Sequence, residues 1–233
     1  MFAPGRRDAR QPTPLDRPIH LRSLIDGDHE CELTDPGEFV ADGFLRLVDR
    51  METEHALRDV WQWFPIDLPG CTMSLFVDAV VSWPDPRSPY RPFPRFVELI
   101  ESTGIHHGFT KATPKPKTYE VWQRILADGG ELDFVCPAFV VDVFLEEIAE
   151  RTIREAVQSG RLVLSVHDSL PTNAGISTFG DHVVISCRDD ERVSRAMVDT
   201  DTPEAVAWGT SRYEEIRSEA SPVDPLERLD LGV

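Results

Sequence analysis

The pattern of polar and apolar positions changes along the N-terminal part of the chain. Residues 1–18 contain four prolines and little apolar content, which is typical of a flexible arm. Residues 19–25 and 29–34 then alternate polar with apolar on either side of the turn Asp26-Gly27-Asp28. Such alternation around a short polar turn predicts a β-hairpin. We therefore expect a basic arm followed by a small hairpin over residues 19–34.

A long amphipathic helix is predicted over residues 35–64. Asp35 suits the N-cap position and Glu38 is placed to complete a capping box, while Pro65 ends the helical pattern. The apolar stripe of this helix is the candidate dimer interface, and it is made of Val40, Phe44, Val48, Met51 and His55. The alternative, that the same stripe packs on the chain's own domain, fits the pattern equally well.

Residues 65–224 alternate between strand-like and helix-like patterns, and residues 225–233 are expected to form a tail. The expected strands are residues 79–81, 105–110, 132–136, 162–166, 175–179, 183–187 and 193–198, and the expected helices are 96–100, 119–126, 139–158 and one that begins at 203. The early strands are separated by helices, which favours parallel strands joined by crossovers, whereas the closely spaced late strands require a meander. The predicted fold class is therefore α/β (α+β) with a mixed sheet.

The charge of the chain is strongly acidic overall but basic at its start. It has 24 Lys and Arg against 41 Asp and Glu, a net charge of −17. Such a surface suits a cell with high internal salt, although an acidic protein from a GC-rich genome is the simpler alternative. Any contact with nucleic acid is expected at the N-terminus, where the candidate DNA-contact residues are Arg6, Arg7, Arg10, Arg17 and Arg22.

Two further features bear on where the protein is found. The sequence has no apolar run long enough to span a membrane and no apolar stretch of a secretory signal at its start, so we expect a cytoplasmic protein without a membrane partner. Its four cysteines are widely spaced, with no Cys-x-x-Cys pair, which predicts reduced and mostly buried thiols.

Several stretches of the sequence match a known family. They are Cys31-Glu-Leu-Thr-Asp-Pro-Gly-Glu, Trp63-Phe-Pro, Tyr90-Arg-Pro-Phe-Pro-Arg-Phe-Val-Glu-Leu-Ile, Val166-His-Asp-Ser-Leu-Pro and Val198-Asp-Thr-Asp-Thr-Pro-Glu-Ala-Val-Ala-Trp. In these stretches the chain resembles archaeal winged-helix transcriptional regulators, especially those of halophiles, which carry a methanogenesis-regulator type middle domain. The resemblance implies that residues 19–34 are the wing of a winged helix, 35–64 a linker helix and 65–224 an effector-sensing domain.

The chain departs from that family before the wing. A complete winged helix needs about 50 more residues there, which form three helices, the last of which enters the major groove. Residues 1–18 cannot replace these helices, because their prolines and lack of apolar periodicity leave nothing to pack. We therefore expect an incomplete DNA-binding head with weakened DNA contact, whether through truncation, a gene fragment or a late start codon.

The α/β part also resembles the phospholipase D-like regulatory domains of other archaeal regulators. The catalytic signature of that fold is His-x-Lys-x4-Asp, and no histidine in the chain has a lysine two residues later. The chain also lacks the usual nucleotide-binding, zinc-protease and nucleophile-elbow motifs. His106 and His107 are adjacent on a predicted strand and should face opposite sides, so they are poorly placed to share one metal ion. We predict no enzymatic activity, no cofactor and no metal site.

A ligand site is predicted from the rule that open α/β sheets bind ligands beyond the carboxyl ends of their parallel strands. The candidate ligand-binding residues at these ends are Thr110, Lys111, Cys136, His167, Asp168 and Ser169. The alternative is that Asp168 and Ser169 cap a turn while Cys136 fills the core. The lysine cluster 111–117 has two interpretations as well, a clamp for an anionic effector or a solvated loop.

These observations favour the effector-sensing domain of a transcriptional regulator that forms a homodimer and binds an unknown small molecule. One alternative is an interaction protein that forms mixed dimers with full-length regulators. A second alternative is a cryptic α/β hydrolytic enzyme that uses His167.

Overall fold

The computed structural model describes residues 24–25, 31–84 and 91–231. The chain divides into two units, Met1–Val48 and Asp49–Val233. In the first unit, strand β1 (Leu24–Ile25) pairs antiparallel with β2 (Cys31–Glu32), and the two form a sheet of their own. The predicted hairpin pairing is confirmed.

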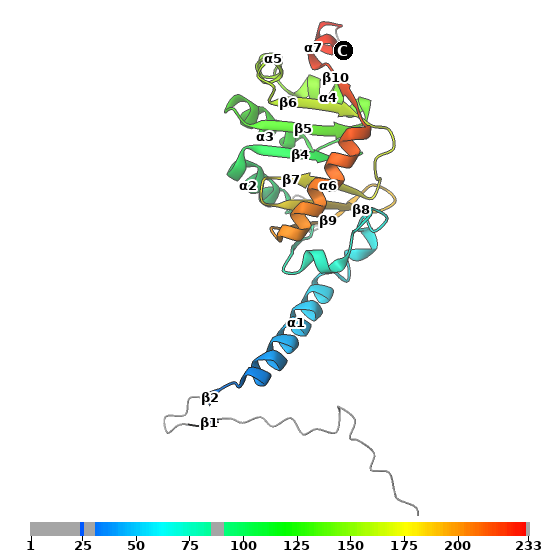
Figure 1. Cartoon of the computed structure of the whole chain (residues 1–233). Helices are drawn as coiled ribbons and strands as arrows, with labels where there is room; N and C mark the ends of the chain where they lie inside the picture. The colour runs from blue at the N-terminus through cyan, green and yellow to red at the C-terminus, as the bar shows by residue number, and fades with distance from the viewer. Residues whose placement is uncertain (1–23, 26–30, 85–90, 232–233) are drawn as a thin grey trace, which may run out of the picture. The chain divides into compact units, whose positions relative to one another are not determined.

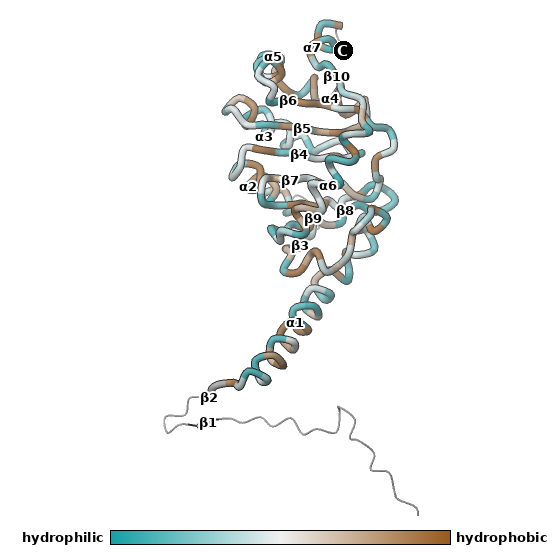
Figure 2. Tube along the Cα trace, viewed as in Figure 1, coloured by the Kyte–Doolittle hydropathy of each residue, from teal (hydrophilic) through white to brown (hydrophobic). Residues whose placement is uncertain are grey.

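Helix α1 (Asp35–Leu57) begins where the sequence predicts but is capped by a different residue (Figure 1). The Thr34 hydroxyl accepts a hydrogen bond from the Gly37 backbone N–H at 3.3 Å, so Thr34, not Asp35, serves as the N-cap. Along the helix, hydrophobic and hydrophilic residues alternate in short stretches, as Figure 2 shows. This is the amphipathic pattern that the sequence predicts.

The predicted end of α1 at Phe64 is wrong, because the helix ends at Leu57. A short 3-10 helix, η2 (Trp61–Trp63), follows, and Phe64 adopts an extended backbone as expected for a residue before proline. Leu57, Val60 and Phe64 are each at most 1% exposed and belong to one core cluster. All three side chains therefore pack into the core, although the α-helix ends at the first of them.

The second unit contains an eight-stranded mixed sheet with the order β10-β6-β5-β4-β7-β8-β9-β3. Its strands are β3 (Val80–Ser82), β4 (Ile105–Phe109), β5 (Glu131–Cys136), β6 (Leu162–Val166), β7 (Ala174–Thr178), β8 (Val183–Arg188), β9 (Ser194–Thr200) and β10 (Ser221–Val223). Strands β4, β5 and β6 run parallel, and β7, β8 and β9 form an antiparallel meander, as predicted. The α/β fold class with a mixed sheet is confirmed.

Helices cover both faces of this sheet (Figure 1). They are α2 (Phe93–Thr103), α3 (Pro116–Ala127), α4 (Ala138–Glu147), α5 (Glu150–Gln158), α6 (Pro203–Glu219) and α7 (Pro225–Asp230), with the 3-10 helix η3 (Met73–Phe76) before β3. On strand β4, His106 packs against Trp122 of α3, while His107 stacks on Tyr213 of α6. Since adjacent strand residues point to opposite faces, α3 and α6 cover opposite faces of the sheet, and the expectation for the two histidines is confirmed.

Two segments differ from the predicted elements. The helix expected over residues 139–158 is divided into α4 and α5, because Ile148 is buried in an extended conformation and the Ala149 N–H donates to Gln123 Oε1 at 2.9 Å. The expected tail over residues 225–233 instead contains α7, whose first turn donates two backbone hydrogen bonds to the Asp224 carboxylate. Strand β10 precedes this helix and pairs with β6.

Of the cysteines with a described side chain, Cys136 and Cys187 are buried free thiols, and Cys71 is a half-buried one. None of the described helices is long and apolar enough to cross a membrane.

Candidate ligand cavity

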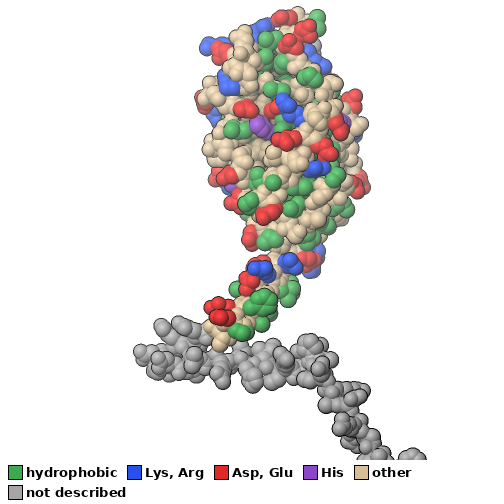
Figure 3. Space-filling model, in the orientation of Figure 1, with side chains coloured by type: hydrophobic (Ala, Val, Ile, Leu, Met, Phe, Trp, Pro, Cys, Tyr) green, Lys and Arg blue, Asp and Glu red, His purple; other side chains and the backbone are tan. Residues whose placement is uncertain are grey.

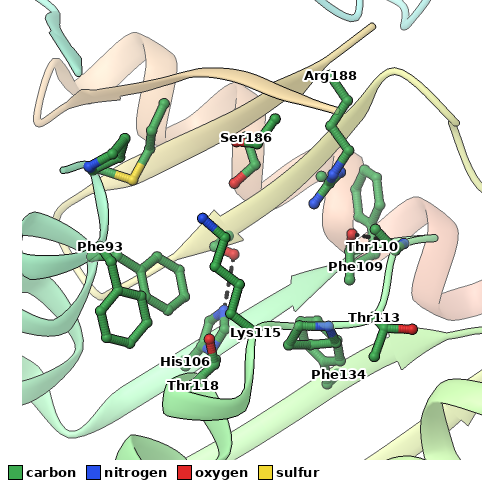
Figure 4. A pocket seen from close by; sticks show the side chains of 18 of the residues that line it. Phe93, His106, Phe109, Thr110, Thr113, Lys115, Thr118, Phe134, Ser186 and Arg188 are labelled. Carbon is green, nitrogen blue, oxygen red and sulfur yellow. Dashed lines mark hydrogen bonds between the residues drawn. The ribbon is translucent and has the colours of Figure 1, made fainter. Parts of the chain in front are cut away.

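A cavity of about 280 Å³ lies on the α3 face of the sheet. It is lined by the first turn of α2, by the start of α3 with the segment before it, and by strands β4, β5, β7, β8 and β9 (Figure 4). The helices and strands are rigid elements that position its side chains without a ligand. Concave sites of this size with a few polar groups are the usual form of a small-molecule site.

A chain of hydrogen bonds forms the polar floor of the cavity. The Trp122 indole N–H donates to His106 Nδ1 at 2.9 Å, and His106 Nε2 lies 2.9 Å from Ser177 Oγ. Because Nδ1 accepts a hydrogen bond, the neutral imidazole carries its proton on Nε2 and donates it to Ser177. The Ser177 hydroxyl hydrogen is then available for a further acceptor.

The same hydrogen bonds exclude a serine hydrolase mechanism for this pair. A general base for Ser177 would need an unprotonated Nε2, whereas the Trp122 donor places the proton there. Burial, with a smaller contribution from the charge of His107, lowers the pKa of His106 to about 3. The ring is therefore neutral near pH 7 and acts as a hydrogen-bond relay rather than as a base.

Two cationic side chains extend into the cavity, Arg188 from β8 and Lys115 from the N-cap of α3 (Figure 4). Among the described residues Arg188 has no ion-pair partner, and its buried Nη1 has no hydrogen-bond partner. Burial lowers the pKa of Arg188, and burial together with the charge of Arg188 lowers the pKa of Lys115. None of the described residues that line the cavity is Asp or Glu.

The positive ends of two helices also meet at this cavity. Thr118 of the first turn of α3 lines it, as do Pro92 and Phe93 at the start of α2. A helix N-terminus carries a partial positive charge and backbone N–H groups without intrahelical partners. Both helix ends therefore add to the field of the two cationic side chains.

An aromatic wall faces these polar groups. Phe93 and Phe96 stack with their ring centroids 6.4 Å apart. The Phe96 and His106 rings form a T-shaped pair with their centroids 5.5 Å apart. Met197 of β9 and Phe134 of β5 also line the cavity. This wall suits the apolar part of a ligand.

Only Thr110 among the ligand-binding residues predicted from the sequence lines the cavity, where its Oγ1 accepts a hydrogen bond from the Ala112 N–H. Cys136 is 1% exposed within the core, and burial raises its pKa to about 12. The backbone N–H of His167 donates to the Cys136 carbonyl, so these two residues are neighbours in the sheet.

The other predicted residues lie apart from the cavity. The His167 ring accepts a hydrogen bond from the Ser169 N–H and approaches Glu219, while Asp168 and Ser169 are exposed. Lys111 is half-buried and does not line the cavity. Cys136 thus fills the core, and Asp168 and Ser169 lie in a turn in which the His167 ring accepts the Ser169 N–H.

Sequence reasoning missed the residues that shape the cavity most, His106, Ser177 and Arg188. A signal for Arg188 is present in strand β8, where Ser186 and Arg188 alternate with the buried Ile185 and Cys187. This alternation places two polar side chains on a covered face of the sheet, where an apolar residue is the usual occupant.

The remaining candidate residues fall outside this site. The candidate DNA-contact arginines Arg6, Arg7, Arg10, Arg17 and Arg22 lie outside the described residues. On α1, Val40, Phe44 and Met51 are between 55% and 64% exposed, His55 is exposed and Val48 is half-buried. Within the described part of the chain, no group of three or more His, Cys, Asp or Glu side chains is arranged to hold a metal ion.

Comparison with known proteins identifies one family. The family model described as methanogenesis regulatory protein FilR1, middle domain, matches residues 89–219. No curated protein sequence matches the chain. Solved structures to which the chain is similar include the archaeal chromatin protein TrmBL2, at 11% identity and a TM-score of 0.49, with 87% of this chain and 76% of that chain covered. Another is the phospholipase D family member Nuc from Salmonella typhimurium, at 10% identity and a TM-score of 0.45, with 63% of this chain and 97% of that chain covered.

Proposed function

Because this chain belongs to the family of the methanogenesis regulatory protein FilR1 middle domain, we propose that it is the effector-sensing part of a transcriptional regulator. In this proposal a small molecule binds in the cavity beneath α2 and α3 and thereby alters the regulator's activity. The observation that carries the proposal is the polar interior of the cavity, where the buried Nη1 of Arg188 has no hydrogen-bond partner among the described residues. Buried polar groups are normally satisfied, so an unsatisfied one in a preformed cavity points to a missing ligand.

The experiment is a thermal-shift screen of the purified chain against a metabolite library, with a variant that fills the cavity. Ser186→Phe places a ring into the cavity, which Ser186 and Lys115 both line. Effectors should raise the melting temperature of the wild type and lose that effect in Ser186→Phe. The matched control is Ser211→Phe on the exposed surface of α6, which should respond like the wild type.

The proposal fails if the screen yields no stabilising compound, or if every such compound stabilises Ser186→Phe as strongly as the wild type. In the second case the compounds bind elsewhere on the protein.

We also propose that the regulator forms a homodimer through α1. Its support is the exposed apolar surface of this helix, which Figure 3 shows as hydrophobic side chains along its length and which includes Phe39, Phe44, Leu45 and Met51. An apolar helix face of this kind is normally covered by a partner. Light scattering should give a dimer for the wild type and a monomer for Phe44→Glu, and a monomeric wild type contradicts the proposal.

The hairpin β1–β2 is proposed as the remnant of a DNA-binding wing, with the N-terminal arginines as weak DNA contacts. If DNA binding depends on them, replacement of all five arginines by glutamine abolishes retention on a DNA column at low salt.

The second candidate function, a partner that forms mixed dimers with full-length regulators, uses the same α1 surface. A pull-down with a full-length relative tests it, and Phe44→Glu should abolish the capture.

A further inference from the structure

We propose that the cavity binds a small organic anion, a carboxylate or a phosphate monoester on an apolar body, with the Arg188 guanidinium as the main anion-binding group. This inference rests on the proposed function, because it names the chemical class of the effector that the cavity accepts. It does not require a particular metabolite.

The first argument is the positive charge of Arg188 in the cavity. Arg188 forms no ion pair among the described residues, and its Nη1 is buried without a hydrogen-bond partner. A buried charge without a counterion is strongly unfavourable. A second cation, Lys115, lines the same cavity, and burial together with the nearby charge of Arg188 lowers its pKa. A bound anion supplies the counterion that Arg188 lacks among the described residues, whereas a neutral ligand does not.

The composition of the chain makes this charge arrangement informative. Acidic residues outnumber basic ones by 41 to 24 in the whole sequence, yet none of the described cavity-lining residues is acidic and three of them, Lys115, Arg188 and Arg192, are basic. A cationic cavity is the reverse of what the acidic composition of the chain predicts. The local charge is therefore better explained by a ligand than by the general composition.

Neutral donors converge on the same space. The Ser177 hydroxyl, which accepts from His106 Nε2, has its hydrogen available for an acceptor in the cavity. The N-terminal ends of α2 and α3 face the cavity with their partial positive charges. Carboxylate and phosphate groups are acceptors with several lone pairs, so they match a site that contains donors and cations together.

The aromatic wall defines the remainder of the ligand. Phe93, Phe96 and Met197 contribute apolar side chains to the lining of the same cavity. A free inorganic ion would leave this surface and most of a cavity of about 280 Å³ unused. The anion should therefore carry a flat or branched apolar body.

The experiment compares matched anionic and neutral probes by fluorine NMR in a phosphate-free buffer. The anionic probes are 4-fluorobenzoate and 4-fluorophenyl phosphate, and the neutral probe of the same shape is 4-fluorobenzamide. At least one anion should bind at least about tenfold more tightly than the amide, since hydrogen bonds to charged groups contribute more than neutral ones. The stronger of the two anions identifies the head group as carboxylate or phosphate.

Variants assign the binding to the cavity. Arg188→Met should weaken the anion's affinity about ten- to hundredfold and leave the amide unchanged. It should fold, because it removes an unpaired buried charge. Lys115→Met should weaken the anion less than Arg188→Met does. The matched control is Arg151→Met on the exposed face of α5, where the affinity of every probe should stay at the wild-type value.

Two outcomes overturn the inference. One is that neither anion binds more tightly than the amide, and the other is that Arg188→Met binds the anions as well as the wild type does. Neither outcome alters the proposed function, which is decided separately by the metabolite screen with Ser186→Phe. If the screen finds neutral compounds whose binding depends on the cavity, the effector site stands and the anionic class is wrong.

Discussion

At the scale of single residues, His106 shows how a buried polar group is made neutral and useful. His106 is 2% exposed, and its ring lies between the Trp122 donor and the Ser177 acceptor. Each ring nitrogen therefore has a partner, which offsets the cost of burying the imidazole. The result is a fixed tautomer that orients the Ser177 hydroxyl at the cavity floor.

Replacement of Ser177 by alanine should reduce stability, because it removes the acceptor for the buried His106 Nε2–H. We expect a loss of about 1–3 kcal/mol in the free energy of unfolding, measured with urea. The control is Ser165→Ala, a serine that is 4% exposed and has no side-chain hydrogen bond among the described residues. Equal losses in both variants would show that the His106–Ser177 bond contributes nothing.

The lowered pKa of His106 predicts a dependence of stability on pH. The unfolded chain protonates this histidine below its ordinary value of 6.5, whereas the folded chain does so only near pH 3. Unfolding therefore takes up a proton, and stability should fall by about 1.4 kcal/mol per unit as the pH drops below 6.5.

Urea unfolding between pH 7 and about pH 5 measures this slope above the range where ordinary carboxylates titrate. In His106→Gln the slope should become smaller, since the group that takes up the proton is gone. An unchanged slope would mean that other histidines account for the pH dependence.

At the scale of elements, one buried ion pair connects α2 to the sheet. Arg95 Nε and Nη2 donate to the same oxygen of Asp199 in β9, at 3.1 and 3.0 Å, and the Asp199 side chain is 1% exposed. The other Asp199 oxygen, Oδ1, has no hydrogen-bond partner among the described residues. Arg95 is thus the main compensation for a buried carboxylate, and it anchors the helix whose first turn lines the cavity.

Removing this partner should be costly. Arg95→Met leaves the Asp199 charge buried and unpaired, so we expect the free energy of unfolding to fall by about 3 kcal/mol or more. The double variant Arg95→Met with Asp199→Asn should recover part of this loss, because the charge is removed as well. Arg154→Met, which breaks exposed ion pairs with Glu150 and Asp230, should cost less than about 1 kcal/mol. A similar loss in both single variants would contradict the argument.

Where the bounds of an element differ from the prediction, contacts with distant residues set them. The sequence between Phe139 and Gln158 contains no Gly or Pro to interrupt a helix. The break at Ile148 arises because that side chain enters the core and Gln123 of α3 accepts the Ala149 N–H. Such a contact between residues 26 positions apart leaves no local signal in the sequence.

At the scale of the whole molecule, the net charge of −17 predicts a protein that is stabilised by salt. Repulsion among exposed carboxylates opposes the compact state, and salt screens it. Raising KCl from about 0.1 M to about 1 M should therefore increase the melting temperature. Most of the gain should come below about 1 M, because the Debye screening length at that concentration is already only about 3 Å.

The measurement is a melting curve at each KCl concentration. A linear increase that continues beyond 1 M and is larger with ammonium sulfate would contradict the screening argument, because it would report stronger hydrophobic burial instead. This outcome would also remove the charge-based reason to associate the chain with a high-salt cell.

The sequence by itself determined the order of most elements, because the periodicity of apolar residues is a local property. It placed the strands between Ile105 and Thr200, with the meander after Val166, and the opposite directions of His106 and His107, but it did not predict β10. The start of α1 at Asp35 and the family resemblance were also readable without coordinates. Only the tertiary structure decided where the candidate site lies.

The physical reason is that a cavity depends on which faces of distant elements meet. Arg188 and Lys115 are 73 positions apart, and neither residue type alone predicts a common site. The rule for parallel sheets pointed to the carboxyl ends of β4, β5 and β6, where Cys136 proved to be core. The cavity instead lies over the junction of the parallel strands with the antiparallel meander, where α2 and α3 cover polar side chains of β7 and β8.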